Sequence, residues 1–162
     1  IVIAVDPPAG YGRKANACGI VCAGLGADGK AYVLDDVSIQ GAKPIEWASR
    51  VVALYHARQA CRVVAEVNQG GAMVEQVLRE VDQTLSFRAV HATRGKAARA
   101  EPVAALYEQG RVRHAGVFPE LEDEMCAGLR DGMKSPDRLD ALVWAVSDLM
   151  LRRVAEPRVR TI

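Results

Sequence analysis

Three strand-like segments follow one another before the first helical segment of this chain. They span 1–5, 17–25 and 30–40, and each contains a run of aliphatic or β-branched residues. Ala27-Asp28-Gly29, between the second and the third segment, is typical of a hairpin turn. The sequence therefore predicts that the chain begins with a three-stranded antiparallel meander.

After this meander, helical and extended segments alternate. Pro44 opens a helix in which apolar residues recur at helical spacing, and Ser135-Pro136 opens a final helix. The further segments that we predict are strands 63–67 and 87–91, a short extended piece 112–115, and helices 72–81, 96–109, 120–129 and 136–152. This order favours an α/β domain whose mixed sheet combines the meander with parallel strands and is flanked by helices. We also expect the first and last apolar helices to pack near the carboxyl edge of the sheet.

Composition fits one compact domain. The chain has 162 residues, of which 50% are hydrophobic and 25% charged, so disordered and fibrous proteins are excluded. We predict a domain over 1–154 and a basic tail or linker over 155–162. The chain begins inside a strand and without Met, so we expect a domain cut from a longer polypeptide. No apolar run approaches the ~20 residues of a membrane span.

Several other classes of site are disfavoured. Gly24-Leu-Gly26-Ala-Asp-Gly29 matches a dinucleotide-binding fingerprint, but a strand follows it where that motif requires a helix. The three histidines and four cysteines show no triad or zinc spacing. We interpret Cys18 and Cys22 as small core residues of a strand.

Four acidic residues carry the strongest signal for chemistry. Asp6 ends the first strand and Glu66 lies near the end of the fourth, so parallel pairing would bring both to the carboxyl edge of the sheet. Asp137 and Asp140 are three residues apart and share a face of the final helix. Taken alone, Asp6 also fits a turn residue before Pro7, and Asp137 fits a residue that favours a helix dipole. Their combination predicts one acidic cluster.

Such a cluster needs a cation, because like charges at close range repel. Oxygen ligands without a histidine or cysteine favour Mg²⁺ or Mn²⁺ over Zn²⁺. Two ions about 4 Å apart can activate a water and stabilise the leaving oxygen of a phosphodiester. The acids therefore predict phosphodiester hydrolysis with two metal ions.

The segments around these acids resemble a known family. Ile3-Ala4-Val5-Asp6-Pro7, Val64-Ala65-Glu66-Val67-Asn68 and the segment 135–143 are similar to the three acidic motifs of the large-terminase nuclease domain. That domain occurs in tailed bacteriophages and phage-derived gene transfer agents, and it has a ribonuclease H-like fold. The resemblance covers nearly the whole chain. It implies that Asp6, Glu66 and Asp140 are metal-binding catalytic acids and that Asp137 is an accessory.

The resemblance also implies a setting. The family cuts double-stranded DNA, with little sequence preference, during genome packaging in the cytoplasm of a bacterial host. Its ATPase motor is missing here, because the chain contains no GxxxxGK[ST] phosphate loop. The intact protein would carry that ATPase domain and would meet a portal and a small terminase.

DNA contacts are predicted from local clustering of basic residues, since the formal net charge is only +1. The stretch 88–113 contains six Lys or Arg residues against two Glu residues. Such side chains bind phosphates without reading bases. The residues that we predict to bind DNA are Arg13, Lys14, Arg94, Lys96 and Arg99. A solvated helix face would explain the same charges.

Three other functions compete with this prediction. A resolvase-like or repair nuclease would share the acidic cluster but act on branched DNA. A sugar-kinase or actin-like nucleotide-binding domain also uses an acid after its first strand, but it needs Gly-rich phosphate loops and a longer chain. A DNA-binding module without catalysis would leave the four acids unexplained.

Overall fold

The computed structural model describes residues 1–8, 10, 12, 16–67, 71–128 and 136–152. Two of the predicted DNA-binding residues, Arg13 and Lys14, lie outside these ranges, as does the predicted tail over 155–162. Within the described part of the chain, every helix is too short or too polar to span a lipid bilayer.

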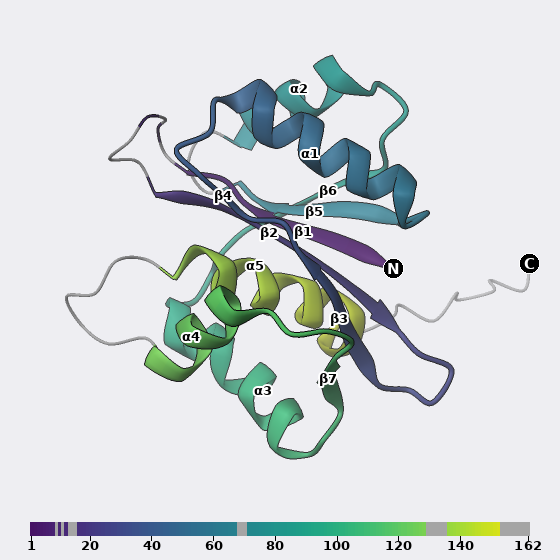
Figure 1. Cartoon of the computed structure of the whole chain (residues 1–162), viewed down its shortest axis with the longest axis vertical. Coiled ribbons are helices and arrows are strands. Elements are labelled where there is room, and N and C mark those ends of the chain that lie inside the picture. Colours follow the sequence, from purple (N-terminus) through teal and green to yellow (C-terminus); the bar gives the residue numbers. More distant parts are fainter. Residues whose placement is uncertain (9, 11, 13–15, 68–70, 129–135, 153–162) are drawn as a thin grey trace, which may run out of the picture.

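One mixed sheet forms the centre of the molecule (Figure 1). Its strands are β1 Val2–Asp6, β2 Ala17–Leu25, β3 Ala31–Asp36, β4 Ile39–Gln40, β5 Arg62–Glu66, β6 Phe87–Val90 and β7 Val112–His114. They lie in the order β6-β5-β1-β2-β3-β7, and β4 pairs with β2. The first three strands pair antiparallel, as predicted, while β5, β6 and β7 join the sheet by parallel pairing.

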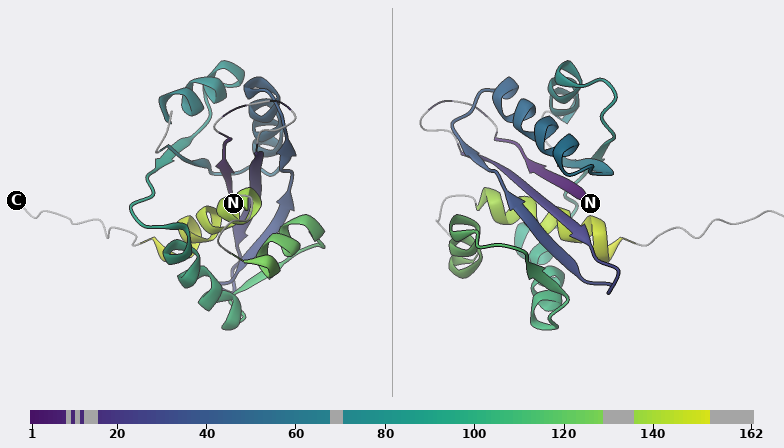
Figure 2. Two further views of the ribbon diagram at one scale, coloured as in Figure 1. Left: turned by 90° about the vertical axis from the view of Figure 1, so that its left-hand side faces the viewer. Right: turned by 45° about the vertical axis from the view of Figure 1, so that its right-hand side comes forward.

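Helices cover both faces of this sheet (Figures 1 and 2). Helices α1 Pro44–Ala57 and α2 Gly71–Val81 lie on one face. Helices α3 Lys96–Glu108, α4 Pro119–Ala127 and α5 Asp137–Val146 lie on the other, and a π-helical turn, η1 Ser147–Leu151, follows α5. The first and last apolar helices, α1 and α5, therefore cover opposite faces of the sheet.

Alternation along β1 decides which side chains meet which helices. Ile3 and Val5 pack into the core under α1 and α2, whereas Val2 and Ala4 pack against the α5 side. Since side chains alternate along a strand, Asp6 extends the row that faces α5. The sheet thus places the first acid beside the helix that carries two others.

Some predicted boundaries differ from the structure. The expected strand over 30–40 is divided into β3 and β4, because the chain turns at Val37 and Ser38, where the Asp36 carboxylate accepts hydrogen bonds from the backbone and hydroxyl of Ser38. The final helix begins at Asp137, with Pro136 as its N-cap, and Ser135 lies outside the described residues. It becomes a π-helical turn at Ser147 instead of continuing as an α-helix to Arg152.

Candidate active site

Two strands deliver the first two acids to one edge of the sheet. β1 and β5 are parallel neighbours, with Val5 paired to Ala65, so Asp6 and Glu66 follow at the carboxyl ends of both strands. Both are half-buried. The parallel pairing on which the sequence argument for these two acids depends is thus present.

Helix α5 supplies the other two acids. Asp137 and Asp140 are both buried, with 5% and 4% of their surface exposed. The start of α5 packs directly on β2 at Gly19, which is the register partner of Asp6. This contact brings the first turn of α5 to the end of β1.

A residue of α4 fixes the same helical turn. The Glu124 carboxylate accepts hydrogen bonds from the backbone N–H groups of Arg138, at 2.9 Å, and Leu139, at 3.1 Å. These N–H groups have no partner within the helix, so Glu124 acts as its cap from another element. The Arg138 side chain also bridges Glu124 and Asp36. Helix α5 is therefore anchored at the turn that presents the acids.

The electrostatics around Asp6 show that the acids converge. Burial, and after it the negative charges of Asp140, Asp137 and Glu66, raise the pKa of Asp6 to about 7, while the positive charge of Lys96 opposes them. An acid at this position is costly to ionise unless a cation lies beside it.

Two basic side chains of α3 supply positive charge to this cluster. Lys96 Nζ forms an ion pair with Asp140 Oδ2. Arg99 Nη2 lies 3.4 Å from Glu66 Oε2 and 3.6 Å from Asp140 Oδ1, so one nitrogen joins an acid of the sheet to an acid of α5. The Arg99 side chain is 11% exposed and that of Lys96 45%. Arg99 is an internal counter-ion, and Lys96 is the accessible one.

Trp144 is a member of this cluster that the sequence reading missed. Its indole Nε1–H donates a hydrogen bond of 3.0 Å to Glu66 Oε2, and the Arg99 guanidinium carbon lies 5.0 Å from its ring centroid. Trp144 follows Asp140 by four residues, so it lies one helical turn further on the same face. The four-residue spacing from Asp140 was therefore the sequence signal that could have placed Trp144 beside the acids.

Oxygen donors of this kind fit a hard divalent cation. Among the residues that the structure describes, however, no group of three or more Asp, Glu, His or Cys side chains is arranged as a finished metal site. Lys96 and Arg99 occupy positions beside Asp140 and Glu66 in this structure. The donor set suits Mg²⁺ or Mn²⁺, and a bound ion would have to draw the carboxylates closer.

The other predicted DNA-binding residues have different surroundings. Arg94 is exposed, and its backbone carbonyl accepts a hydrogen bond from Arg99 Nη1. Arg88, which the sequence reading counted in the same basic stretch, pairs with the buried Asp148 carboxylate. The basic side chains of the stretch 88–113 therefore have three kinds of surroundings. Some contact the acidic cluster, one pairs with Asp148, and others are exposed to solvent.

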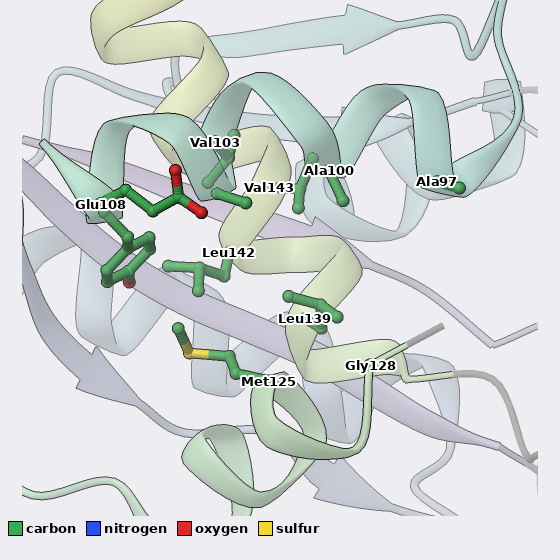
Figure 3. Close-up of a pocket in the computed structure, with 11 residues that line it drawn as sticks. Ala97, Ala100, Val103, Glu108, Met125, Gly128, Leu139, Leu142 and Val143 are labelled. Carbon is green, nitrogen blue, oxygen red and sulfur yellow. The ribbon is translucent and has the colours of Figure 1, made fainter. Parts of the chain in front are cut away.

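A separate apolar pocket of about 410 Å³ lies between α3, α4 and α5 (Figure 3). Its walls include Val103 of α3, Met125 of α4 and Leu142 of α5. None of the four acids, all of them in the described part of the chain, lines it. The pocket is thus distinct from the acidic cluster.

Comparisons with known proteins agree with this geometry. The model of a family described as "Terminase RNaseH-like domain" matches residues 3–149. No curated protein sequence gives a significant match.

Solved structures share the fold. The large terminase nuclease from thermophilic phage G20c, with bound zinc, is similar with a TM-score of 0.68 and 17% identity, covering 90% of this chain and 80% of that one. A mutant nuclease domain of the large terminase subunit gp2 of bacterial virus Sf6, with manganese and beta-thujaplicinol, gives 0.60 and 15%, covering 89% and 86%. The yeast mitochondrial Holliday junction resolvase Ydc2 gives 0.54 and 12%, covering 89% and 76%. The fold is ribonuclease H-like, as predicted.

Proposed function

The chain belongs to the terminase RNase H-like domain family, and we propose that it is a metal-dependent endonuclease that cuts double-stranded DNA with little sequence preference during packaging of a viral or virus-like genome. The observation that carries this proposal is the convergence of three further carboxylates, those of Glu66, Asp137 and Asp140, on Asp6, whose pKa they help to raise. A cluster of this kind is costly to a fold and is explained by a cation that the protein binds for its reaction.

Each acid has a role in the proposal. Asp6, Glu66 and Asp140 bind the cations, and Asp137 is an accessory carboxylate at the start of α5. Two bound Mg²⁺ or Mn²⁺ ions would supply water activation and charge stabilisation at the leaving oxygen. Solved structures of similar nucleases contain zinc, cobalt, magnesium or manganese, which supports a divalent ion here.

The basic side chains of α3 serve both the acids and the DNA. Lys96 and Arg99 neutralise the carboxylates in this structure. A DNA phosphate beside the acids would attract the same two cations. Arg94 is exposed and its backbone carbonyl accepts a hydrogen bond from Arg99, so we propose that its side chain binds a further phosphate. Arg13 and Lys14, outside the described residues, remain predicted phosphate contacts. Contacts to phosphate alone do not read sequence, hence the low specificity that we propose.

The family supports a wider setting for this domain. We propose that the whole protein carries an ATPase motor domain, works with a portal and a small terminase, and acts in the cytoplasm of a bacterial host. A second candidate function, resolution of branched DNA, is favoured by the likeness to the Ydc2 resolvase. Cleavage of a four-way junction, compared with a linear duplex of the same sequence, separates the two functions.

The central test is cleavage of supercoiled plasmid in Mn²⁺, Mg²⁺ or EDTA. We expect nicking and linearisation with either metal and none in EDTA. Asp6→Asn and Asp140→Asn should each lower the rate at least about 100-fold, the scale of a lost transition-state contact in an enzyme. Asp123→Asn makes the same chemical change at an exposed position of α4 and should cut at the wild-type rate.

Two results would count against the proposal. Cleavage that persists in EDTA would exclude a metal mechanism. A folded domain that binds DNA but cuts it under none of these conditions would favour a binding module.

A further inference from the structure

Glu66 is the acid of the cluster that most needs help to stay in place. It has three rotatable side-chain bonds, against two in Asp6 and Asp140, and it projects from the end of a strand. A glutamate that is held in one rotamer loses more conformational entropy than an aspartate does. Another side chain must therefore fix its carboxylate if it is to meet a cation at a set position.

Trp144 is suited to that task. The indole N–H is a donor only, so it can hold one oxygen of Glu66 without competing for the cation as a ligand. The bond runs from α5 to β5, and it therefore ties the helix that carries Asp140 to the strand that carries Glu66.

Arg99 completes the connection. Its guanidinium lies over the Trp144 ring, 5.0 Å from the centroid, and one of its nitrogens reaches both Glu66 and Asp140. A planar guanidinium stacked on an aromatic ring is oriented by that ring. The ring of Trp144 thus sets the position of the cation that bridges two acids, while its N–H sets the position of one of them.

We propose that Trp144 is a positioning residue for the metal site, because its N–H orients Glu66 and its ring orients Arg99 between Glu66 and Asp140. The inference rests on the proposed function, in which Glu66 and Asp140 bind the metal. Groups that hold metal ligands in place typically change metal affinity or activity by about 10- to 100-fold when they are removed.

The first test compares two tryptophan variants in metal affinity. Trp144→Phe keeps an aromatic ring under Arg99 but removes the N–H, and Trp47→Phe makes the same change in α1, on the opposite face of the sheet. Calorimetric titration with Mn²⁺ should give a dissociation constant about 10-fold higher for Trp144→Phe and unchanged for Trp47→Phe. Circular dichroism and melting curves should show both variants folded at the titration temperature. Equal Mn²⁺ affinity in a folded Trp144→Phe and the wild type would overturn the inference.

The second test does not depend on the folding of Trp144→Phe. The chain has two tryptophans, so Trp47→Phe leaves Trp144 as the one fluorophore of its kind. Addition of Mg²⁺ should shift or change the intensity of its emission, and a further Glu66→Gln substitution should abolish that response. A constant emission during Mg²⁺ binding that calorimetry detects would show that Trp144 does not sense the site.

The two proposals fail in different ways. If the wild type binds no Mn²⁺ and cuts no plasmid, the proposed function fails and the positioning role fails with it. If the wild type binds and cuts, and Trp144→Phe does both equally well, only the positioning role is wrong.

Discussion

Gly19 of β2 lies so close to the backbone of Asp137 that a β-carbon on Gly19 would be 2.0 Å from the Asp137 carbonyl oxygen. Real β-carbons do not approach other atoms so closely, so only glycine fits here. Gly19 is also the register partner of Asp6. One residue without a side chain therefore sets how near the α5 acids come to the β1 acid.

Gly19→Ala should push the start of α5 away from β2. The added β-carbon would clash with rigid backbone, so we expect the free energy of unfolding to fall by about 1–3 kcal/mol, the usual cost of overpacking. Plasmid cleavage should fall by about 100-fold, as displacements of ~1 Å at a catalytic site can do. Urea denaturation and cleavage assays measure the two effects.

Gly116→Ala is the matched control. A β-carbon there would make an ordinary contact at 3.4 Å with the Phe118 ring. Stability should change by no more than about 0.5 kcal/mol, as for most surface substitutions. A Gly19→Ala variant that was as stable and as active as this control would show that α5 is not positioned by Gly19.

The sequence was sufficient to predict the sheet and the strand-end acids. Apolar runs with β-branched residues mark β1 and β5, and the helix before β5 favours a crossover to a parallel strand, while the structure identifies β1 as the neighbour of β5. Asp6 was found because it ends such a run, and Glu66 because it interrupts one. These signals lie within short segments of the sequence, so they can be recognised without knowing how the elements pack.

Contacts between distant elements were not predictable in the same way. Lys96 and Arg99 were predicted to bind phosphate, but spacing along the chain does not show that both side chains form ion pairs with Asp140. Glu124 looked like an ordinary acid of α4, although it caps α5. The side of the sheet that α1 occupies was not predictable, because amphipathic spacing shows that a helix has a buried face and not which face of the sheet it covers.

Asp6→Asn should stabilise the metal-free domain at pH 8. The pKa of Asp6 is about 7 in the folded protein, against an ordinary value of 3.8, because of burial and the neighbouring acids. Between these two values the folded state binds more protons than the unfolded state, so stability falls as pH rises and the full penalty applies above about pH 7. In EDTA the variant should melt at a higher temperature than the wild type at pH 8, with the difference vanishing at pH 4.

The control for this effect is Asp123→Asn, at an exposed position of α4. It should change the melting temperature little at either pH. An Asp6→Asn domain that melts below the wild type at pH 8 would mean that the surrounding cations already compensate the charge of Asp6.

Lys96→Met should strengthen metal binding while it weakens DNA binding. Lys96 pairs with Asp140, which it must release to a bound cation, and its side chain is 45% exposed. Such a pair contributes up to ~1 kcal/mol, so Mn²⁺ should bind up to about 5-fold more tightly without it. If Lys96 also contacts a phosphate, the slope of log affinity for DNA against log salt should become shallower by about 1.

Lys30→Met removes a lysine that pairs with Asp28 at the β2–β3 hairpin, and it should alter neither quantity. Weaker Mn²⁺ binding in Lys96→Met than in this control would mean that Lys96 organises the acids instead of competing for them.

Glu124→Ala should loosen the first turn of α5 and, with it, the acids. Two backbone N–H groups of that turn lose their acceptor and the positive end of the helix dipole loses a negative charge, so we expect a loss of about 1–2 kcal/mol in urea denaturation. Metal affinity should fall as well, because Asp137 and Asp140 lie in the turn that Glu124 holds. Glu80→Ala is the control, because it also removes a glutamate from a helix, at an exposed position of α2. It should leave the free energy of unfolding and the metal affinity near their wild-type values. Equal stability of the two variants would mean that the packing of α5 on β2 is enough to hold the acids without this cap.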